Sequence, residues 1–435
     1  MCEPSDPGYE GAVTPWNLAV SMRPAAVIAV ADADDVAAAL RFAAARGLRA
    51  GVQATGHGAV PALAGHLLVS TKNLNEVTIH PAGWARVGAG VKWSRVIEAA
   101  APLGYAALNG SASGVGVVGY TTGGGVGPMV RTYGLAADRV RAFEVVTGDG
   151  IQRRVTPTEH PDLFFGLRGG KGSLGIVTAV EFDLIPMTSF YGGAIYFDGR
   201  DAADVIGRWR SWSADLPEQA TTSFALLRLP ALPFVPGPLA GKLTIGVRFV
   251  WTGHAREGER LLASVREVAP VILDGVRVSP YTAIDSVHAD PVDPMPAMGR
   301  SVLLKEFPAA ADALLQHAGH DAASPQVIVE VRQLDGAYSR PGTHPSAFDH
   351  RDARFSVFVA GVPDVPGTAE HGERLLAALQ PWAHDGVWPN FAPPFNALTA
   401  KAAYRPATPA RLRATPEAYA PDGILTGGAA LRQQT

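Results

Sequence analysis

Two glycine-rich stretches decide how this sequence folds. The first reads Gly51-Val52-Gln53-Ala54-Thr55-Gly56-His57-Gly58-Ala59, and the second runs from Asn109 to Gly127 as NGSASGVGVVGYTTGGGVG. Glycine at this density between apolar runs is unfavourable in chain entropy unless the backbone must approach another group closely. A phosphate-bearing cofactor meets that condition, because backbone N–H groups can turn toward its oxygens. The pair therefore predicts a cradle for a dinucleotide, with His57 at its reactive end.

The residues before the first stretch predict a strand–helix–strand unit. Residues 25–30 have the pattern of a short buried strand, and residues 32–47 form an Ala-rich helix that Asp32 or Asp34 can cap. A second strand is expected over Arg49–Gln53, so the His57 loop lies at its carboxyl end. Further strands and helices continue to Pro186, including a hairpin across Thr147-Gly148-Asp149.

From about residue 188 the pattern changes. Strand-like runs alternate with helical ones, which is typical of an α+β arrangement with a sheet covered on one face by helices. The expected strands are 194–197, 222–227, 243–251, 326–333 and 354–359, and the expected helices are 203–214, 255–268 and 309–318. Residues 388–435 read as a helical tail.

Composition excludes several classes of protein. The chain has 435 residues, 47% apolar and 18% charged, with a formal charge of −3, so it gives no indication of nucleic-acid or anionic-membrane binding. Its one cysteine, Cys2, excludes an intramolecular disulfide and a multi-cysteine metal site, and no metal is expected. We find no secretory signal pattern and no apolar run of membrane-spanning length, and a cytoplasmic enzyme is the expectation.

The second stretch also contains a weak match to another motif. Gly114-x-Gly116-x-x-Gly119 fits the Rossmann pyrophosphate fingerprint, and Asp138 follows at nearly the distance of a ribose contact. That motif should follow an apolar strand and open a helix. Here Asn109-Gly110-Ser111 precedes it, and the later glycines would disrupt the helix, so an NAD-binding Rossmann unit is disfavoured.

Four motifs in register resemble a known family. They are ATGHG around His57, GVGVVGYTTGGGVG at 114–127, Arg131-x-Tyr133-Gly134-Leu135, and DLFFGLRGGKGSLGIVTAVEF at 162–182. Together they resemble the FAD-linked oxidases of the berberine-bridge-enzyme-like, vanillyl-alcohol oxidase-like group with a PCMH-type FAD-binding domain. The resemblance implies an FAD-binding domain at 1–187, an α+β substrate-binding domain with an antiparallel sheet at 188–387, and a tail at 388–435 that returns to the FAD domain.

The resemblance also implies roles for particular residues. His57 would be bonded through its imidazole to the flavin 8α-methyl, and the backbone of residues 54–59 would hold the pyrophosphate; a histidine that is only hydrogen-bonded in a tight turn is the alternative. Residues close to the flavin would be Gly119, Thr121, Thr122, Gly124 and Gly125, with Gly175, Ile176 and Val177 near its other face or the adenosine. The alternative for the two threonines is hydroxyls that satisfy the local backbone.

Two positions depart from the family pattern. Many relatives attach the flavin a second time through a cysteine where this chain has Ala112, so a single link through His57 is the most that we expect. Relatives also carry a tyrosine-containing motif near the C-terminus, where this chain reads Trp388-Pro389-Asn390-Phe391. Asn390 can still hydrogen-bond the flavin or the substrate, but the usual general base is missing.

Other residues are candidates for that base. Tyr120 ranks first because the family match places it near the ring, followed by Glu330, Tyr338, His350 and Tyr404. Glu330 and Arg332 lie two apart on one face of an expected strand, so they either both face the flavin or form a structural ion pair. His350 fits a solvated or packing turn better than catalysis.

These observations lead to a prediction of function. We expect an FAD-dependent oxidase that takes a hydride from a bulky, largely apolar small molecule, such as a secondary-metabolite intermediate. In relatives a small β-branched residue admits oxygen, and Val115 at that position favours O2 as the final acceptor. The alternatives are a non-oxidative cyclase or other catalyst with a structural FAD, and a flavin-binding protein without catalysis. The oligomeric state is not predicted.

Overall fold

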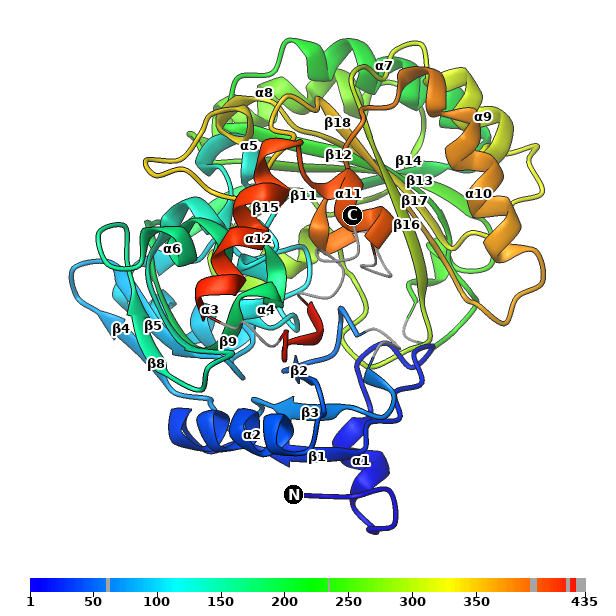
Figure 1. The fold of residues 1–435 in the computed structure, drawn as a ribbon. Coiled ribbons are helices and arrows are strands. Elements are labelled where there is room, and N and C mark those ends of the chain that lie inside the picture. Colours follow the sequence, from blue (N-terminus) through cyan, green and yellow to red (C-terminus); the bar gives the residue numbers. More distant parts are fainter. Residues whose placement is uncertain (60–62, 234, 392–396, 420–422, 428–435) are drawn as a thin grey trace.

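The chain folds into an N-terminal part, a large sheet covered by helices, and a tail that crosses back to the N-terminal part (Figure 1). The structure is a computed structural model, and it describes residues 1–435 except 60–62, 234, 392–396, 420–422 and 428–435. The arrangement is mixed α and β with a large antiparallel sheet, as the sequence predicts. Among the described residues, no helix combines the length and apolar character needed to cross a membrane.

A small parallel sheet holds the first glycine-rich stretch. Its strands β1 (Ala26–Ala29), β2 (Ala50–Gln53) and β3 (Leu67–Ser70) are ordered β1-β3-β2. Helix α2 (Ala33–Ala45) connects β1 to β2, and the Asp32 side chain caps it by accepting a 2.9 Å hydrogen bond from the backbone N–H of Asp35. The predicted strand–helix–strand unit is confirmed. Strand β3 lies between the two strands of this unit and pairs with both in parallel.

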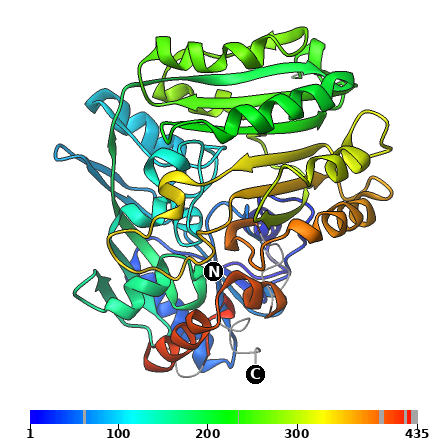
Figure 2. The same ribbon diagram turned by 90° about the horizontal axis from the view of Figure 1, so that it is seen from above.

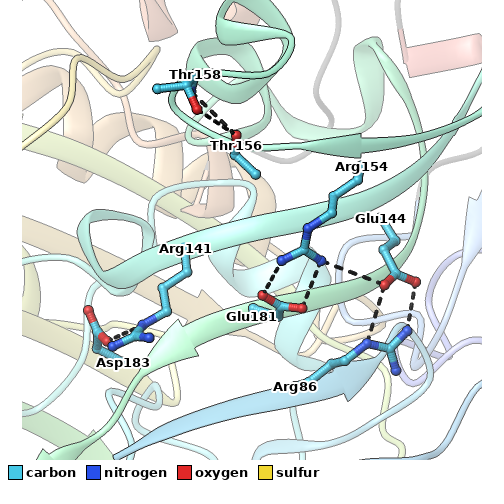
Figure 3. A network of polar contacts seen from close by, with 8 residues as sticks. All are labelled: Arg86, Arg141, Glu144, Arg154, Thr156, Thr158, Glu181 and Asp183. Atoms are coloured by element: carbon cyan, nitrogen blue, oxygen red, sulfur yellow. Dashed lines mark hydrogen bonds and ion pairs between the residues drawn. The ribbon is translucent and has the colours of Figure 1, made fainter.

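A second sheet forms the other half of the N-terminal part. Its order is β4 (Val77–His80), β5 (Trp84–Gly88), β9 (Gly175–Asp183), β7 (Val140–Thr147) and β8 (Gln152–Val155), and the predicted hairpin is β7–β8. Helices α3 (Trp93–Ala100) and α6 (Pro161–Leu167) contribute to the core below it. On the other face, Arg86 pairs with Glu144 and Arg154 with Glu181, at 2.6 and 2.7 Å (Figure 3). These pairs are partly exposed, so they keep the face polar and add little stability.

The third sheet is antiparallel and carries helices on one face (Figures 1 and 2). Its order is β14 (Val271–Asp274), β11 (Ser189–Asp198), β13 (Leu243–Trp251), β12 (Ala220–Arg228), β17 (Ile328–Gln333), β18 (Phe355–Gly361) and β16 (Met298–Leu304), with β15 (Arg277–Pro280) also on β11. Helices α7 (Ala202–Ala214), α8 (Ala255–Arg266), α9 (Ala311–Ala318) and α10 (Thr368–Ala378) pack on alternate residues of these strands, among them Phe224, Val247 and Val331. The strand residues that alternate with these point to the opposite face of the sheet.

The tail lies against the N-terminal part. Helices α11 (Ala397–Ala403) and α12 (Ala407–Tyr419) follow the large sheet, and Arg411 of α12 pairs with Asp162 of α6 at 2.7 Å. Farther on, Leu425 forms a parallel bridge with Ala50, whose backbone N–H donates to the Ile424 carbonyl at 2.7 Å. Residues almost 375 positions apart along the chain therefore meet at strand β2, directly before the His57 loop.

Short helices complete the fold. They are α1 (Tyr9–Val13), α4 (Val117–Thr121) and α5 (Val130–Tyr133), and a two-stranded piece pairs β6 (Tyr105–Ala106) with β10 (Ile185–Pro186). Helix α4 has five residues, and Gly116 before it bridges antiparallel to Lys92. Asp138 pairs with Arg351 at 2.7 Å. None of this is a Rossmann unit, in agreement with the sequence analysis.

Candidate active site

The fold brings the two glycine-rich stretches into contact. A Cβ atom built on Gly116 would lie 3.5 Å from the Thr55 hydroxyl, and the His57 imidazole hydrogen-bonds the backbone of Gly114. Ala54, Thr55 and Ala59 are half-buried and Gly58 is exposed, so the loop that carries them borders open space. Val115 is half-buried on the facing stretch, beside Ala112. The segments that the sequence predicts to act together therefore form one surface.

The N-terminal segment holds His57 in place. The Trp16 indole stacks on the imidazole, with ring centroids 4.2 Å apart and planes 18° apart, and the backbone N–H of Trp16 donates to the Thr55 carbonyl at 3.0 Å. Gly56 has φ +80°, and a Cβ there would lie 2.6 Å from Pro15. Only glycine fits this turn without moving Pro15 and Trp16 away from the ring. The sequence offered no signal for Trp16, which lies some forty positions upstream.

His57 is a neutral imidazole with one free nitrogen. Burial lowers its pKa from 6.5 to about 4, helped by the charge of Lys92, although the hydrogen bond to Gly114 acts in the opposite direction. Its Nε2 is buried and has no hydrogen-bond partner. A buried nitrogen without a partner is unfavourable, which indicates that another group completes the site.

Three more residues of the two stretches have buried polar atoms without partners. They are both amide atoms of Gln53, the Tyr120 hydroxyl and the Thr121 hydroxyl. Gln53 is the last residue of β2, and its position directly before the loop is the signal that the sequence analysis missed. Together with His57 these groups provide donors and acceptors for a polar heterocycle, so the residues present fit an FAD group.

The glycines of the second stretch differ in their surroundings. Gly119 is exposed, and a Cβ built on it would meet nothing within 4 Å. Gly124 and Gly125 instead face protein, because a Cβ would lie 2.3 Å from the Phe348 ring in one case and 2.7 Å from Ala136 in the other. The Thr122 hydroxyl donates to the Val118 carbonyl at 2.8 Å, the local role that the sequence left open for it.

Strand β9 contributes its side chains to the core. Ile176 and Val177 are buried in two different apolar clusters, on opposite faces of the strand. A Cβ on Gly175 would lie 2.4 Å from Val145, so close packing against β7 accounts for this glycine. The side chains of Ile176 and Val177 are therefore occupied by packing within the protein.

Asn390 joins the tail to the second stretch. Its Nδ2 donates to the Tyr120 carbonyl at 2.8 Å, and its Oδ1 accepts from Lys171 Nζ at 2.7 Å. Desolvation lowers the pKa of Lys171 from 10.5 to about 8, and among the described residues no carboxylate lies within ion-pair distance of it. Lys171 lies inside the quoted motif at 162–182, yet its amino-acid type alone did not single it out as a member of this site.

The candidate bases have different environments. Tyr120 is buried and its raised pKa keeps it a phenol, so its free hydroxyl can bind a ligand but is a weak base. The Tyr338 hydroxyl donates to the His350 carbonyl and accepts from Trp388 Nε1, both at 2.9 Å, which occupies it within the protein. The Tyr404 hydroxyl donates to the Gly169 carbonyl at 3.0 Å. His350 is buried beside His384.

Glu330 forms the ion pair that the sequence analysis kept as one alternative. Its carboxylate contacts Arg332 at 3.1 Å, Arg248 at 2.8 Å and His288 at 3.3 Å, and it accepts a 2.7 Å hydrogen bond from Ser223. Although burial opposes ionisation, the two arginines hold the pKa of Glu330 well below its usual range. A carboxylate stabilised in this way is a poor proton acceptor at neutral pH.

The chain is similar to known proteins that are linked to FAD. Residues 24–156 match the family described as FAD binding domain. The chain is 34% identical to FAD-dependent monooxygenase FUP4 of Fusarium proliferatum over 177 residues, 40% of this chain and 34% of that protein. It is 27% identical to (R)-6-hydroxynicotine oxidase of Paenarthrobacter nicotinovorans over 297 residues, 66% of this chain and 62% of that protein. The matched stretch thus spans less than two thirds of either relative.

Solved structures share the fold over nearly the whole chain. The 6-hydroxy-D-nicotine oxidase of Arthrobacter nicotinovorans superposes with a TM-score of 0.83 at 24% identity, covering 97% of this chain and 95% of that one. BBE-like 1 of Physcomitrella patens gives 0.84 at 17% identity, covering 98% and 95%. Glucooligosaccharide oxidase of Acremonium strictum, described with a 6-S-cysteinyl, 8α-N1-histidyl FAD, gives 0.82 at 18% identity, covering 98% and 96%.

Residues 24–156 are therefore similar to an FAD binding domain, within a fold that this chain shares with solved structures of oxidases. The predicted resemblance is confirmed: this chain matches an FAD binding domain, is similar in sequence to FAD-linked oxidoreductases, and shares its fold with BBE-like 1 and with oxidases of solved structure.

Proposed function

We propose that this protein is an FAD-dependent oxidase that takes a hydride from a bulky, largely apolar small molecule and passes the electrons to O2. The FAD binding domain at 24–156 and the oxidases among the relatives support this proposal. The several fungal FAD-dependent monooxygenases among them favour an intermediate of secondary metabolism as the substrate. When bound, the flavin supplies the acceptor for the hydride at N5.

The observation that carries the proposal is the unpartnered Nε2 of His57. A neutral imidazole nitrogen is a good nucleophile, and the low pKa keeps the ring neutral at physiological pH. We therefore assign the covalent flavin link to His57 Nε2. No second link is expected, because Ala112 replaces the cysteine and Cys2 pairs with Val27 at strand β1 instead.

Other residues of the two stretches would hold and orient the reactants. The backbone of residues 54–59 would bind the pyrophosphate, and Gln53 and Thr121 would offer hydrogen bonds to the ring system. The Tyr120 hydroxyl, a neutral phenol with no partner, would bind the heteroatom of the substrate. Val115 would border the path of oxygen.

The test compares two histidines that each stack on a tryptophan. His57→Ala removes the proposed attachment point, and His80→Ala removes an exposed histidine whose ring lies 4.7 Å from that of Trp84. Acid-precipitated protein is examined for retained flavin absorbance, and the peptide containing residue 57 is weighed by mass spectrometry. We expect retained flavin in the parent and in His80→Ala, and none in His57→Ala.

Turnover assays complete the test. Anaerobic addition of candidate alcohols or amines should bleach the flavin, and readmitted air should restore the colour with formation of hydrogen peroxide. Flavin released intact by acid from the parent protein would contradict the covalent link. Conversion of a substrate without bleaching would instead support a non-oxidative catalyst with a structural FAD, and absence of any turnover would support a flavin-binding protein.

A further inference from the structure

A second group of buried polar residues lies on the large sheet. Arg248 on β13, Glu330 and Arg332 on β17, and Ser223 on β12 occupy the positions between the residues that pack on helices α7–α10. They therefore point to the opposite face of the sheet, toward the N-terminal part. Register places them together, since Ser223 pairs with Arg248 on one side and with Arg332 on the other.

This face of the sheet borders the second glycine-rich stretch. Val250, on the same face of β13 as Arg248, belongs to the apolar cluster that contains Tyr120. A small cavity of about 10 Å³, enough for one water-sized group, lies against this face of the sheet. Pro128 lines it from the N-terminal part, and Thr221, Ser223, Arg248, His288 and Arg332 line it from the large sheet and its loops. The positive charge of Arg332 also reaches Tyr120, whose phenol pKa it lowers against the larger effect of burial.

The group carries an excess of positive charge. Two guanidinium groups share one carboxylate, and burial together with Arg248 lowers the pKa of His288, which keeps that ring neutral. The charge of the half-buried Asp290 raises the pKa of Arg248, but this carboxylate lies within 4 Å of neither arginine. Buried charges in proteins are normally paired, so one positive charge is left for a ligand to neutralise.

The unpartnered atoms of the group identify that ligand. Arg248 Nε, Arg332 Nη1 and the Thr221 hydroxyl are buried without hydrogen-bond partners, and each can donate. The residues that carry them are 3%, 6% and 5% exposed. Arginine offers a planar set of donors that matches a carboxylate, and a hydroxyl can donate a further hydrogen bond to one of its oxygens.

We infer that this group binds a carboxylate of the substrate, so that the molecule oxidised is a largely apolar carboxylic acid. The inference rests on the proposed function, because the cavity borders Pro128, which directly follows the second glycine-rich stretch. Arg332 and Arg248 bind and orient the carboxylate, and Glu330 fixes both guanidinium groups rather than accepting a proton.

The test uses benzoate as a probe carboxylate and benzyl alcohol as its uncharged counterpart. Binding to the purified full-length protein is followed by the thermal shift and by perturbation of the flavin spectrum. Arg332→Gln should weaken benzoate binding at least tenfold and leave benzyl alcohol unaffected. Arg228→Gln is the matched control, since Arg228 also lies on the large sheet but donates to the carbonyls of Ala318, Gly319 and Ala322 outside the cavity.

A second variant protects the test against a folding defect. Thr221→Val removes one unpartnered hydroxyl at nearly constant shape, and it should weaken benzoate binding about threefold. Equal benzoate binding by the parent and both cavity variants would overturn the inference, as would no benzoate binding by the parent or equal competition by phosphate. The thermal shift needs no flavin, so a carboxylate site can be detected even if the flavin link at His57 fails its own test.

Discussion

The two halves of the second glycine-rich stretch use the same amino acid for opposite reasons. Around Gly114, Gly116 and Gly119 the absence of side chains leaves room, and a Cβ atom built on Gly119 would have nothing within 4 Å. From Gly123 to Gly127, other parts of the protein occupy the space that a side chain would need. These are Asn390, the Phe348 ring, Ala136 and the Asn109 carbonyl. A glycine-rich sequence is therefore not uniformly a ligand cradle: one half is open toward the proposed flavin, and the other allows Phe348 and Asn390 to pack closely.

The largest effect on stability that distinguishes the two halves is expected from Gly124→Ala. Its φ of +105° is strained for any L side chain, and the new Cβ would lie 2.3 Å from the buried ring of Phe348. Strain and overpacking together should lower the free energy of unfolding by about 2–5 kcal/mol. Urea unfolding of the flavin-free protein measures this change. A midpoint equal to that of the parent would mean that Phe348 does not pack there.

The pH dependence of stability tests the environment of His57, whose ring hydrogen-bonds the backbone of Gly114 in the open half. The folded pKa of about 4 lies below the ordinary 6.5, so the unfolded chain binds a proton in this range and the folded chain does not. His57 thus contributes stability above pH 6.5 that is lost as the pH falls toward 4, on the order of 1–2 kcal/mol after allowance for partial exposure.

The measurement is urea unfolding of flavin-free parent and His57→Ala proteins between pH 7 and pH 4.5. Other buried histidines, such as His288 and His371, also have lowered pKa values, but they are present in both proteins and cancel in the difference. Identical pH profiles for the two proteins would show that His57 is solvated and not held as a neutral ring.

The smallest effect on stability is expected from Gly119→Ala. Gly119 lies within helix α4 and has open space beside it, so alanine should leave stability unchanged or raise it by up to about 1 kcal/mol. Its effect should appear instead in the cofactor, as a lower ratio of flavin absorbance to protein absorbance in the purified enzyme. Normal flavin content would indicate that the open half does not face the cofactor. Gly124→Ala should therefore lower the free energy of unfolding, whereas Gly119→Ala, five positions away, should leave it unchanged or raise it.

Much of the fold follows from local pattern. The periodicity predicts α2, β3, β7–β8 and the helix-covered sheet, because each buries a continuous apolar face. Strands β14 and β16 and helix α10 were missed. Strand β14 lies at the sheet edge with three of its four residues exposed, so it lacks the alternation by which strands are recognised. Helix α10 has Gly372 inside it and no side-chain cap at its start, which removes the usual helix signals.

The sequence by itself indicated the class of protein, because the glycine-rich stretches and the order of the four motifs that resemble a known family can be read along the chain without the fold. It also determined that His57 lies at the end of a strand. Which glycines are open, that Trp16 stacks on His57, that Lys171 meets Asn390, and that Arg248 joins Glu330 and Arg332 were decided only by tertiary structure. The physical reason is that burial and charge pairing depend on residues brought together from distant positions, and no local pattern records those distances.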